Sequence, residues 1–280
     1  MKKIFITAFL LRVFLSFLVW HPDVNNHVDW GIRFWQYGPQ KFFAPETNVW
    51  SYTWPNQPPG TIYIFAGIRK LFEFVFAFFW WINVNIPIFP SGIITFFESN
   101  LYPALLKFPS ILADLGIAYL IYRILNFQFS IFKVNKKVAI AGAAIFLFNP
   151  VIWYNSSVWG QTDAIVNFFV LLSLYLLLQK KLTFSLLAFS LSLYIKASLL
   201  IFLPIFAIIA IRQKYKLSDY VLSIVYCLVP IALFTLPFSK GNPLIWLYEI
   251  YKDKVFTQQL QVITANAFNL WAGIAGIHER

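Results

Sequence analysis

The sequence predicts an all-α membrane protein, a bundle of about nine to ten spans in which each span needs about 20 apolar residues. Its 280 residues are 60% hydrophobic and only 12% charged, and the mean hydropathy is +0.68. Soluble domains contain about 25% charged residues. Apolar runs alternate with short basic clusters along the chain. We expect residues 1–280 to form a single transmembrane domain, incomplete at the C-terminal end because the sequence stops inside an apolar pattern.

The individual spans follow from the apolar runs and from the charges that interrupt them. Arg12 lies inside the first run, and we expect it to face the bundle or reach the interface, because charge in lipid is costly. Residues 61–68 and 71–89 also allow a second interpretation, one long helix with a re-entrant piece. The expected spans cover residues 4–20, 61–68, 71–89, 103–125, 138–154, 164–178, 182–195, 197–211 and 220–237, with a partial span from 265 onward.

The basic clusters give this bundle an orientation. When the spans alternate in direction, each tight cluster of lysines and arginines falls on the same side of the membrane. This is the distribution that the positive-inside rule predicts for the cytoplasmic side. The N-terminus is therefore expected in the cytoplasm, and the net charge of +11 gives no reason to expect a nucleic-acid partner. The clusters are Lys2-Lys3, Arg69-Lys70, Lys133 to Lys137, Lys180-Lys181 and Arg212 to Lys216.

A long polar loop, residues 21–59, follows the first span and is expected outside the cytoplasm. It is too long for a simple connection and is more typical of a functional loop. Asp23 and Trp30 are seven residues apart, so they share a face if this part of the loop is helical, and His27 lies on that face too. Asp29 would point elsewhere.

Polar residues from several segments are expected to meet on the same outer face as this loop. Ionisable residues in a membrane bundle are candidates for function, because burying them is costly. A carboxylate there can act as a general base, and a lysine can stabilise a departing phosphate. The set consists of His21, Asp23, His27, Asp29, Glu98, Lys107, the run Trp159-Gly-Gln-Thr-Asp163, Lys196, Asn266 and Asn269.

These motifs resemble those of the GT-C superfamily, polytopic glycosyltransferases that use polyprenyl-phosphate sugars. Asp23, seven residues before Trp30, is similar to the catalytic-base position of that family, and Gln57-Pro-Pro resembles its Tyr-Pro-Pro motif. Two departures are Pro22, where the family usually has glycine, and Gln57 in place of tyrosine. Four further stretches resemble the bacterial and archaeal mannosyltransferase-like branch: Phe108-Pro-Ser-Ile-Leu-Ala-Asp114, Phe148-Asn-Pro150, Trp159-Gly-Gln-Thr-Asp163 and Asn266-Ala-Phe-Asn-Leu-Trp271.

The resemblance, which extends over residues 1 to 275, implies an inverting hexosyltransferase of a prokaryotic cell membrane. Its donor would be a polyprenyl-phosphate sugar such as mannose, and its acceptor a lipid, a glycan or a protein. Asp23 and Asp29 would be the catalytic residues. Some members of the family use a divalent cation. Such hard metal ions bind about six oxygen ligands, and the sequence contains no dense cluster of acidic residues. A metal is therefore not favoured, and the identity of any cofactor is left open. The expected substrate-binding residues are His27, Trp30, Lys107, Gln161, Asp163, Lys196, Asn266 and Asn269.

Each of these residues also has a simpler structural interpretation. For Asp23 the alternative role is a cap of the helix that follows Pro22, and for Asp163 a cap of the helix that starts at Ala164, since aspartate is a favoured capping residue. Lys107 and Asp114 share a helical face and allow an ion pair, and Lys196 allows a snorkelling side chain. At the level of the whole protein, the alternatives are a transporter or flippase of a lipid-linked precursor, or a non-catalytic scaffold subunit.

Overall fold

A computed structural model describes residues 1–19, 21–44, 47, 51, 53–126 and 135–253, and these residues form helices and connections only. The predicted all-α class is confirmed. In chain order the elements are α1 Lys2–Leu18, α2 Val24–Tyr37, α3 Pro39–Phe42, α4 Pro59–Asn85, α5 Gly92–Asn126, α6 Lys136–Phe148, α7 Pro150–Tyr154, the π-helix η1 Asn155–Trp159, α8 Asp163–Leu178, α9 Leu182–Ile195, the 3₁₀ helix η2 Ala197–Phe202, α10 Leu203–Arg212, α11 Leu217–Thr235 and α12 Pro243–Ile250.

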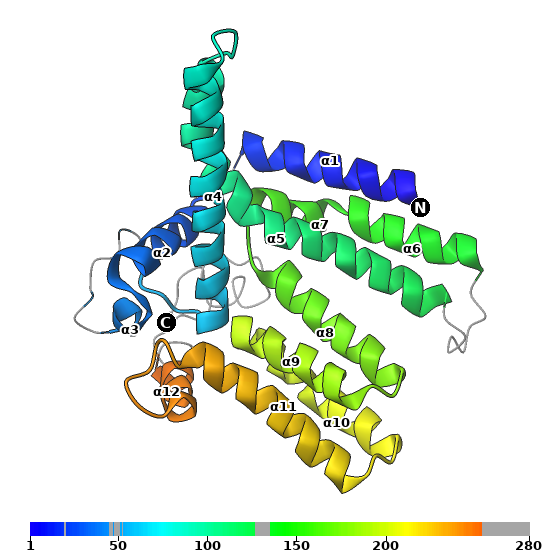
Figure 1. Ribbon diagram of the computed structural model, residues 1–280. Coiled ribbons are helices and arrows are strands. Elements are labelled where there is room, and N and C mark those ends of the chain that lie inside the picture. The colour runs from blue at the N-terminus through cyan, green and yellow to red at the C-terminus, as the bar shows by residue number, and fades with distance from the viewer. Residues whose placement is uncertain (20, 45–46, 48–50, 52, 127–134, 254–280) are drawn as a thin grey trace, which may run out of the picture.

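Most of the apolar helices run side by side in one bundle (Figure 1). Small residues allow close contact between α1, α5 and α6, where Ala8, Ala118 and Ala143 pack together around Leu147. The N-terminus, the end of α5 and the turn between α8 and α9 lie at one end of the bundle, and α2, α3 and α12 lie at the other (Figure 1). The helix ends that carry Lys2-Lys3, Lys136-Lys137, Lys180-Lys181 and Arg212 to Lys216 lie away from α2. The cluster Arg69-Lys70 of α4 does not: it lies beside α2, where Lys70 Nζ is 4.7 Å from the ring centre of Trp35.

Length and apolarity qualify only some of these helices as membrane spans. Among the described residues, α5 and α11 are long and apolar enough to cross a bilayer, and the pair α6 with α7 and η1, bent by 47°, makes a third if it is one broken span. Three further apolar helices are shorter: Asp163–Leu178, Leu182–Ile195 and Ala197–Arg212. The larger number of nine to ten spans stays a prediction.

Of the two interpretations of residues 61–89, the structure agrees with the long helix: α4 is continuous and passes through Arg69 and Lys70. The division into separate spans at 61–68 and 71–89 is wrong, and so is the next boundary. Glu73 compensates both charges, at 2.9 Å from Arg69 and 2.7 Å from Lys70. The next helix, α5, begins at Gly92 and not at Pro103, so the expected outer loop 90–102 is helical.

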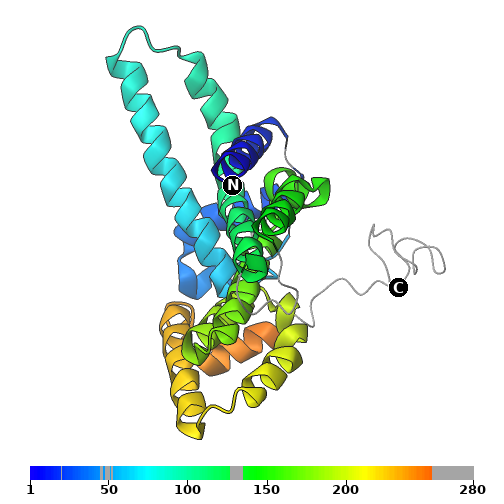
Figure 2. The same ribbon diagram turned by 90° about the vertical axis from the view of Figure 1, so that its right-hand side faces the viewer.

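Together α4 and the first part of α5 form a long hairpin that stands across the direction of the bundle (Figures 1 and 2). Helix α5 then turns into the bundle. Its two internal prolines, Pro103 and Pro109, each lack the N–H of a regular helical hydrogen bond and favour such a bend. The change of direction brings the second half of α5 beside α1 and α8.

The first loop folds onto the base of α4 through an aromatic core. Helix α2 is strongly amphipathic and buries Trp30 and Phe34 against Phe65 of α4. Phe42 from α3 and Phe238, which follows α11, complete this cluster. Each such aromatic side chain buries about 150–250 Å². The cluster therefore fixes the predicted loop as a folded cap at the end of the bundle opposite the N-terminus (Figure 1).

Candidate active site

The carboxylate of Asp23 lies where the start of the first loop meets the segment that leads from η1 to α8. One of its oxygens, Oδ2, accepts hydrogen bonds from Trp159 Nε1 at 2.8 Å and from Gln161 Nε2 at 3.1 Å. Its side chain is 41% exposed, so the group is open to solvent. Although Asp23 precedes the first residue of α2, its side chain makes no capping hydrogen bond to that helix. The simpler interpretation of Asp23 as a cap does not describe its contacts.

His21 lies beside the carboxylate of Asp23. Its Nδ1 atom accepts the backbone N–H of Asp23 at 3.2 Å and lies 3.5 Å from Asp23 Oδ1. A ring nitrogen that accepts a hydrogen bond carries no proton, so the contact with Oδ1 is not an ion pair. The imidazole packs on the indole of Trp159, with 4.9 Å between ring centroids.

Lys196 and Asp163 form an ion pair at 2.5 Å on the same part of the surface. Asp163 is the first residue of α8, and Lys196 follows the last residue of α9. Neither side chain is fully buried, with exposed fractions of 29% for Lys196 and 38% for Asp163. Asp163 makes no capping hydrogen bond, as Thr162 is the N-cap residue of α8. The pair is thus open to an incoming charged group.

Two hydrogen bonds fix the loop between η1 and α8 that carries Gln161. Ser110 of α5 donates to the backbone oxygen of Gln161 at 2.6 Å, and Thr162 donates to Gln57 Oε1 at 3.4 Å. Gln57 belongs to the Gln-Pro-Pro motif that leads into α4. The motif residues Gln57, Gln161 and Asp163, which are distant in sequence, therefore lie together.

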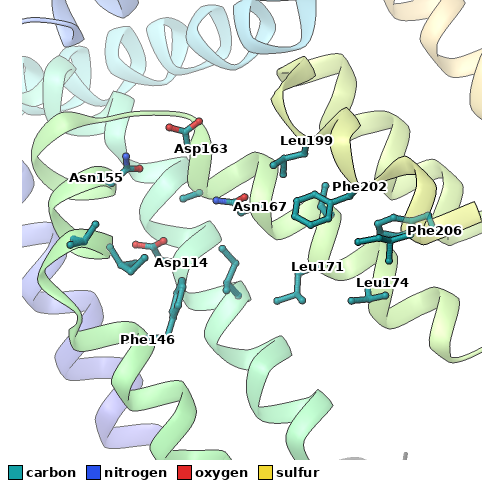
Figure 3. Close-up of a pocket in the computed structure, with 16 residues that line it drawn as sticks. Asp114, Phe146, Asn155, Asp163, Asn167, Leu171, Leu174, Leu199, Phe202 and Phe206 are labelled. Carbon is teal, nitrogen blue, oxygen red and sulfur yellow. The ribbon is translucent and has the colours of Figure 1, made fainter. Parts of the chain in front are cut away.

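A largely apolar cavity of about 530 Å³ begins at Asp163 and passes between α5, α8, η2 and α10. Figure 3 shows Asp163, Asn155 and Asn167 toward one end of this cavity and Leu174 and Phe206 toward the other. Polar groups at one end and hydrocarbon along the rest match an amphiphilic ligand with one charged end.

His27 lies beneath these groups and is buried, with 3% of its surface exposed. Its ring stacks on Phe65 at 4.3 Å, and its Nδ1 atom has no hydrogen-bond partner among the described residues. Burial lowers the pKa of His27 to about 4; the nearby charge of Lys196 lowers the pKa further, and that of Asp23 opposes both. His27 is therefore a neutral residue near both charged groups at pH 7.

This lowered pKa predicts that the protein loses stability as the pH falls from about 6.5 to 4. In this window the unfolded chain binds a proton at His27 and the folded chain does not, so protons favour unfolding. The full effect is about 3 kcal/mol for a shift of this size. We expect His27→Phe, which retains the ring stacking, to lose less stability between pH 7 and pH 4 than the unchanged protein in thermal unfolding measured in detergent. An equal loss in both proteins would contradict this assignment.

Three residues expected to bind substrate or act in catalysis have other contacts in the structure. Both oxygens of Asp29 are occupied, one by Arg33 at 2.9 Å and the other by the backbone N–H of Ser51 at 3.1 Å. Trp30 is buried and donates its indole N–H to the backbone oxygen of Thr53. These contacts stabilise the first loop, and the site roles expected for Asp29 and Trp30 stay predictions.

Lys107 is the third of these residues and is fully buried. Its ammonium group donates to the backbone oxygens of Ser16 at 2.9 Å and Val19 at 2.7 Å, at the C-terminal end of α1. A cation at this end of a helix is favourable. Lys107 therefore fixes the chain just before His21, and Asp114 pairs with Arg12 and not with Lys107. The substrate contact expected for Lys107 stays a prediction. Asn266 and Asn269 lie outside the described residues.

The sequence interpretation did not find the partners of Asp114. This carboxylate accepts hydrogen bonds from Arg12 Nε at 3.1 Å and from Ser156 Oγ at 2.6 Å. Arg12 faces the bundle interior, one of the two positions expected for it, and is fully buried. Arg12 and Asp114 are far apart in sequence, so no spacing pattern could pair them.

Comparison with known proteins supports the enzyme class. Residues 161–262 match the profile of the ALG3 protein family, a mannosyltransferase family of the GT-C type. The matched region includes Gln161, Asp163 and Lys196 and covers about a third of the chain. No curated protein matches the sequence. No solved structure matches it either. The similarity of residues 161–262 to this family confirms the predicted class of membrane glycosyltransferase, with hexosyl transfer as its activity.

Proposed function

We propose that the protein transfers a hexose, specifically mannose, from a polyprenyl-phosphate carrier to a hydroxyl group of a lipid, glycan or protein acceptor. The reaction inverts the anomeric configuration and takes place at the end of the bundle formed by α2 and α12. The observation that carries this proposal is the convergence of Asp23, Gln161, Asp163 and Lys196, which come from three separate segments. Asp163 of this group also lines an apolar cavity.

Asp23 acts as the general base of this reaction. Trp159 and Gln161 occupy its Oδ2 atom, so its Oδ1 atom is left to accept a proton from the acceptor hydroxyl. The acceptor oxygen forms a bond to the anomeric carbon while the bond from that carbon to the phosphate oxygen breaks. The phosphate keeps the electron pair, and Asp23 keeps the proton. Such a base typically contributes about 10²–10⁴-fold to a rate.

Lys196 stabilises the phosphate that leaves. Its ammonium group is paired with a single carboxylate oxygen of Asp163 and is partly exposed, so a phosphate can share it. A charge-assisted hydrogen bond to phosphate is stronger than one between neutral groups, and it strengthens as negative charge develops on the leaving oxygen. The isoprenoid chain of the donor would then lie in the cavity that begins at Asp163.

The proposal also gives the protein an orientation. About nine to ten spans would cross a prokaryotic cell membrane, with the N-terminus and four of the five basic clusters in the cytoplasm, because short cytoplasmic loops carry an excess of lysine and arginine. The fifth cluster, Arg69-Lys70, would lie on the side of the site, where Glu73 compensates its charges. The site then faces outward, where the folded first loop covers one side of it. Hydroxyl groups of envelope glycans, lipids and secreted proteins are accessible on that face.

A reconstituted assay tests the function directly. The full chain in nanodiscs would be given polyprenyl-phosphate [³H]mannose together with a lipid, a glycan or a peptide acceptor, and the products separated and their anomeric configuration determined. We expect labelled product of inverted configuration with at least one acceptor. Movement of unchanged donor between leaflets of a proteoliposome, without labelled product, would support the flippase alternative and overturn the proposal.

Lys196→Gln provides a second test of the site. We expect kcat to fall by about a hundredfold, the range seen when one charge-stabilising donor is removed, and Lys196→Arg to retain most of the activity. Lys181→Gln, a matched change in the turn at the other end of the bundle, is expected to have no effect. Equal losses for Lys196→Gln and Lys196→Arg would exclude charge stabilisation by this side chain.

A further inference from the structure

We propose that a buried network of Arg12, Asp114 and Ser156 positions the general base, acting through the π-helix η1. The inference rests on the proposed function, because it concerns how Asp23 is held for proton transfer. Arg12 and Ser156 are fully buried and line no part of the cavity, whereas Asp114, 2% exposed, lines the cavity wall that faces α7 and η1. They are positioning residues.

The network joins three elements at one carboxylate oxygen. Arg12 of α1 and Ser156 of η1 both donate to Asp114 Oδ2 on α5, at 3.1 Å and 2.6 Å. Arg12 also donates from Nη1 to the backbone oxygen of Ala8 at 3.3 Å, which fixes its position on α1. The segment η1 is thus tied to the two helices that enclose it.

The same short helix carries the donor that holds Asp23. Trp159 is the last residue of η1, and its indole N–H bonds to Asp23 Oδ2 at 2.8 Å. The helix stops at Gly160, whose φ of 74° lies in the left-handed region, where glycine is favoured. The anchor at Ser156 and the donor at Trp159 are therefore parts of one five-residue unit.

The π-helical form of η1 points to a functional role, because π-helices are rare, occur mostly as single turns and are frequent at functional sites. The stability of the bundle does not require buried charges here. Replacing a buried ion pair by apolar residues of similar volume is often neutral or stabilising. What an apolar pair cannot supply is the directional bond to Ser156. That bond sets the rotation of η1 and hence the direction of the indole N–H.

The position of the indole matters because it selects which oxygen of Asp23 is free for the acceptor. If η1 rotates, the indole leaves Oδ2 and the carboxylate turns. A displacement of about 1 Å in a reacting group can cost about a hundredfold in rate. Substitutions of Ser156 should therefore act on kcat and leave KM for the lipid donor unchanged, since Ser156 does not line the cavity. Asp114 does line it, so the split between KM and kcat is measured at Ser156.

A double-mutant cycle tests this route. We expect Trp159→Phe to lower kcat about tenfold and Ser156→Ala to lower it about fivefold. The double variant should lower kcat about tenfold and not about fiftyfold, because the effects of residues that act through one another are not additive. Ser173→Ala is the matched control, another fully buried serine that donates to a backbone oxygen, at Ser185, and lies away from Asp23. Multiplied losses in the double variant would overturn the proposal.

A second measurement does not depend on activity. Hydrogen–deuterium exchange should be faster at the amides of residues 155–161 in both Ser156→Ala and Asp114→Asn, and unchanged there in Ser173→Ala. Unchanged exchange in the first two variants would overturn the positioning role. Asp23→Asn separates this proposal from the proposed function. If Asp23→Asn still transfers sugar, the assignment of Asp23 as the base fails. If Asp23→Asn is inactive but the losses in the double-mutant cycle multiply, only the network is rejected.

Discussion

Asp23→Asn is expected to lower kcat for sugar transfer by about a thousandfold, within the range that a general base contributes. The amide has nearly the same shape as the carboxylate, and its oxygen can still accept the hydrogen bonds from Trp159 and Gln161. The remaining nitrogen cannot take a proton from the acceptor. The measurement is single-turnover transfer from labelled polyprenyl-phosphate mannose, with donor binding determined separately.

The control for this experiment is Asp219→Asn, the same change at the start of α11, where asparagine also serves near a helix N-terminus. Asp219 accepts the backbone N–H of Lys216 at the end of the bundle away from the site. We expect full activity in this variant and unchanged donor binding in Asp23→Asn. Transfer at the normal rate in Asp23→Asn would exclude Asp23 as the base.

Arg12→Met is expected to have the largest effect on stability. It removes the only cation in hydrogen-bond contact with Asp114 among the described residues and leaves a carboxylate with 2% exposure inside the bundle. Breaking a buried pair in this way typically costs about 3–5 kcal/mol. Unfolding of the protein in mixed micelles, followed by circular dichroism, measures the loss.

The double variant Arg12→Met, Asp114→Leu provides the comparison. With both charges removed, no buried charge is left without its partner, and most of the lost stability should return. Activity should not return with it, because Ser156 loses the bond to α5 and retains only acceptors in its own segment, such as the backbone oxygen of Ile152 at 3.3 Å. A double variant as unstable as Arg12→Met alone would show that packing, and not the uncompensated charge, causes the effect.

The fold class could be predicted from composition because lipid and apolar helices impose a strong pattern, but two boundaries could not. Arg69 and Lys70 were interpreted as the end of a span. In the structure their charges are compensated within the same helix by Glu73, and the guanidinium of Arg69 lies 5.3 Å from the ring centre of Tyr102. A charge cluster with local partners is compatible with a continuous helix.

Pro103 was interpreted as a helix start, which is where proline is most often tolerated. The structure places it inside α5, at the part of the helix that leaves the hairpin and enters the bundle. A proline in a long helix signals a bend as readily as a start. The sequence alone contains no sign of which applies, since the neighbouring helices determine whether a bend is stabilised.

The candidate site could be predicted in part, because its residues belong to short motifs placed on one face by the topology. Asp23, Gln161, Asp163 and Lys196 lie together as that placement requires. The spacing of Lys107 and Asp114 allows an ion pair between them, yet Lys107 bonds to the end of α1 and Asp114 to Arg12. Spacing identifies residues on a common face of one helix and cannot identify a partner on another helix.

The unequal oxygens of Asp23 have a consequence for the choice among hydroxyls on one acceptor. Indole and amide hydrogens occupy the inner oxygen, whereas the outer one receives no hydrogen-bond donor among the described residues and lies 3.5 Å from the His21 ring nitrogen. To reach this outer oxygen, one hydroxyl of an acceptor sugar must therefore pass the imidazole of His21. The linkage position of the new glycosidic bond is then decided by the shape of this passage, because hydroxyls of nearly equal acidity offer no other basis for selection.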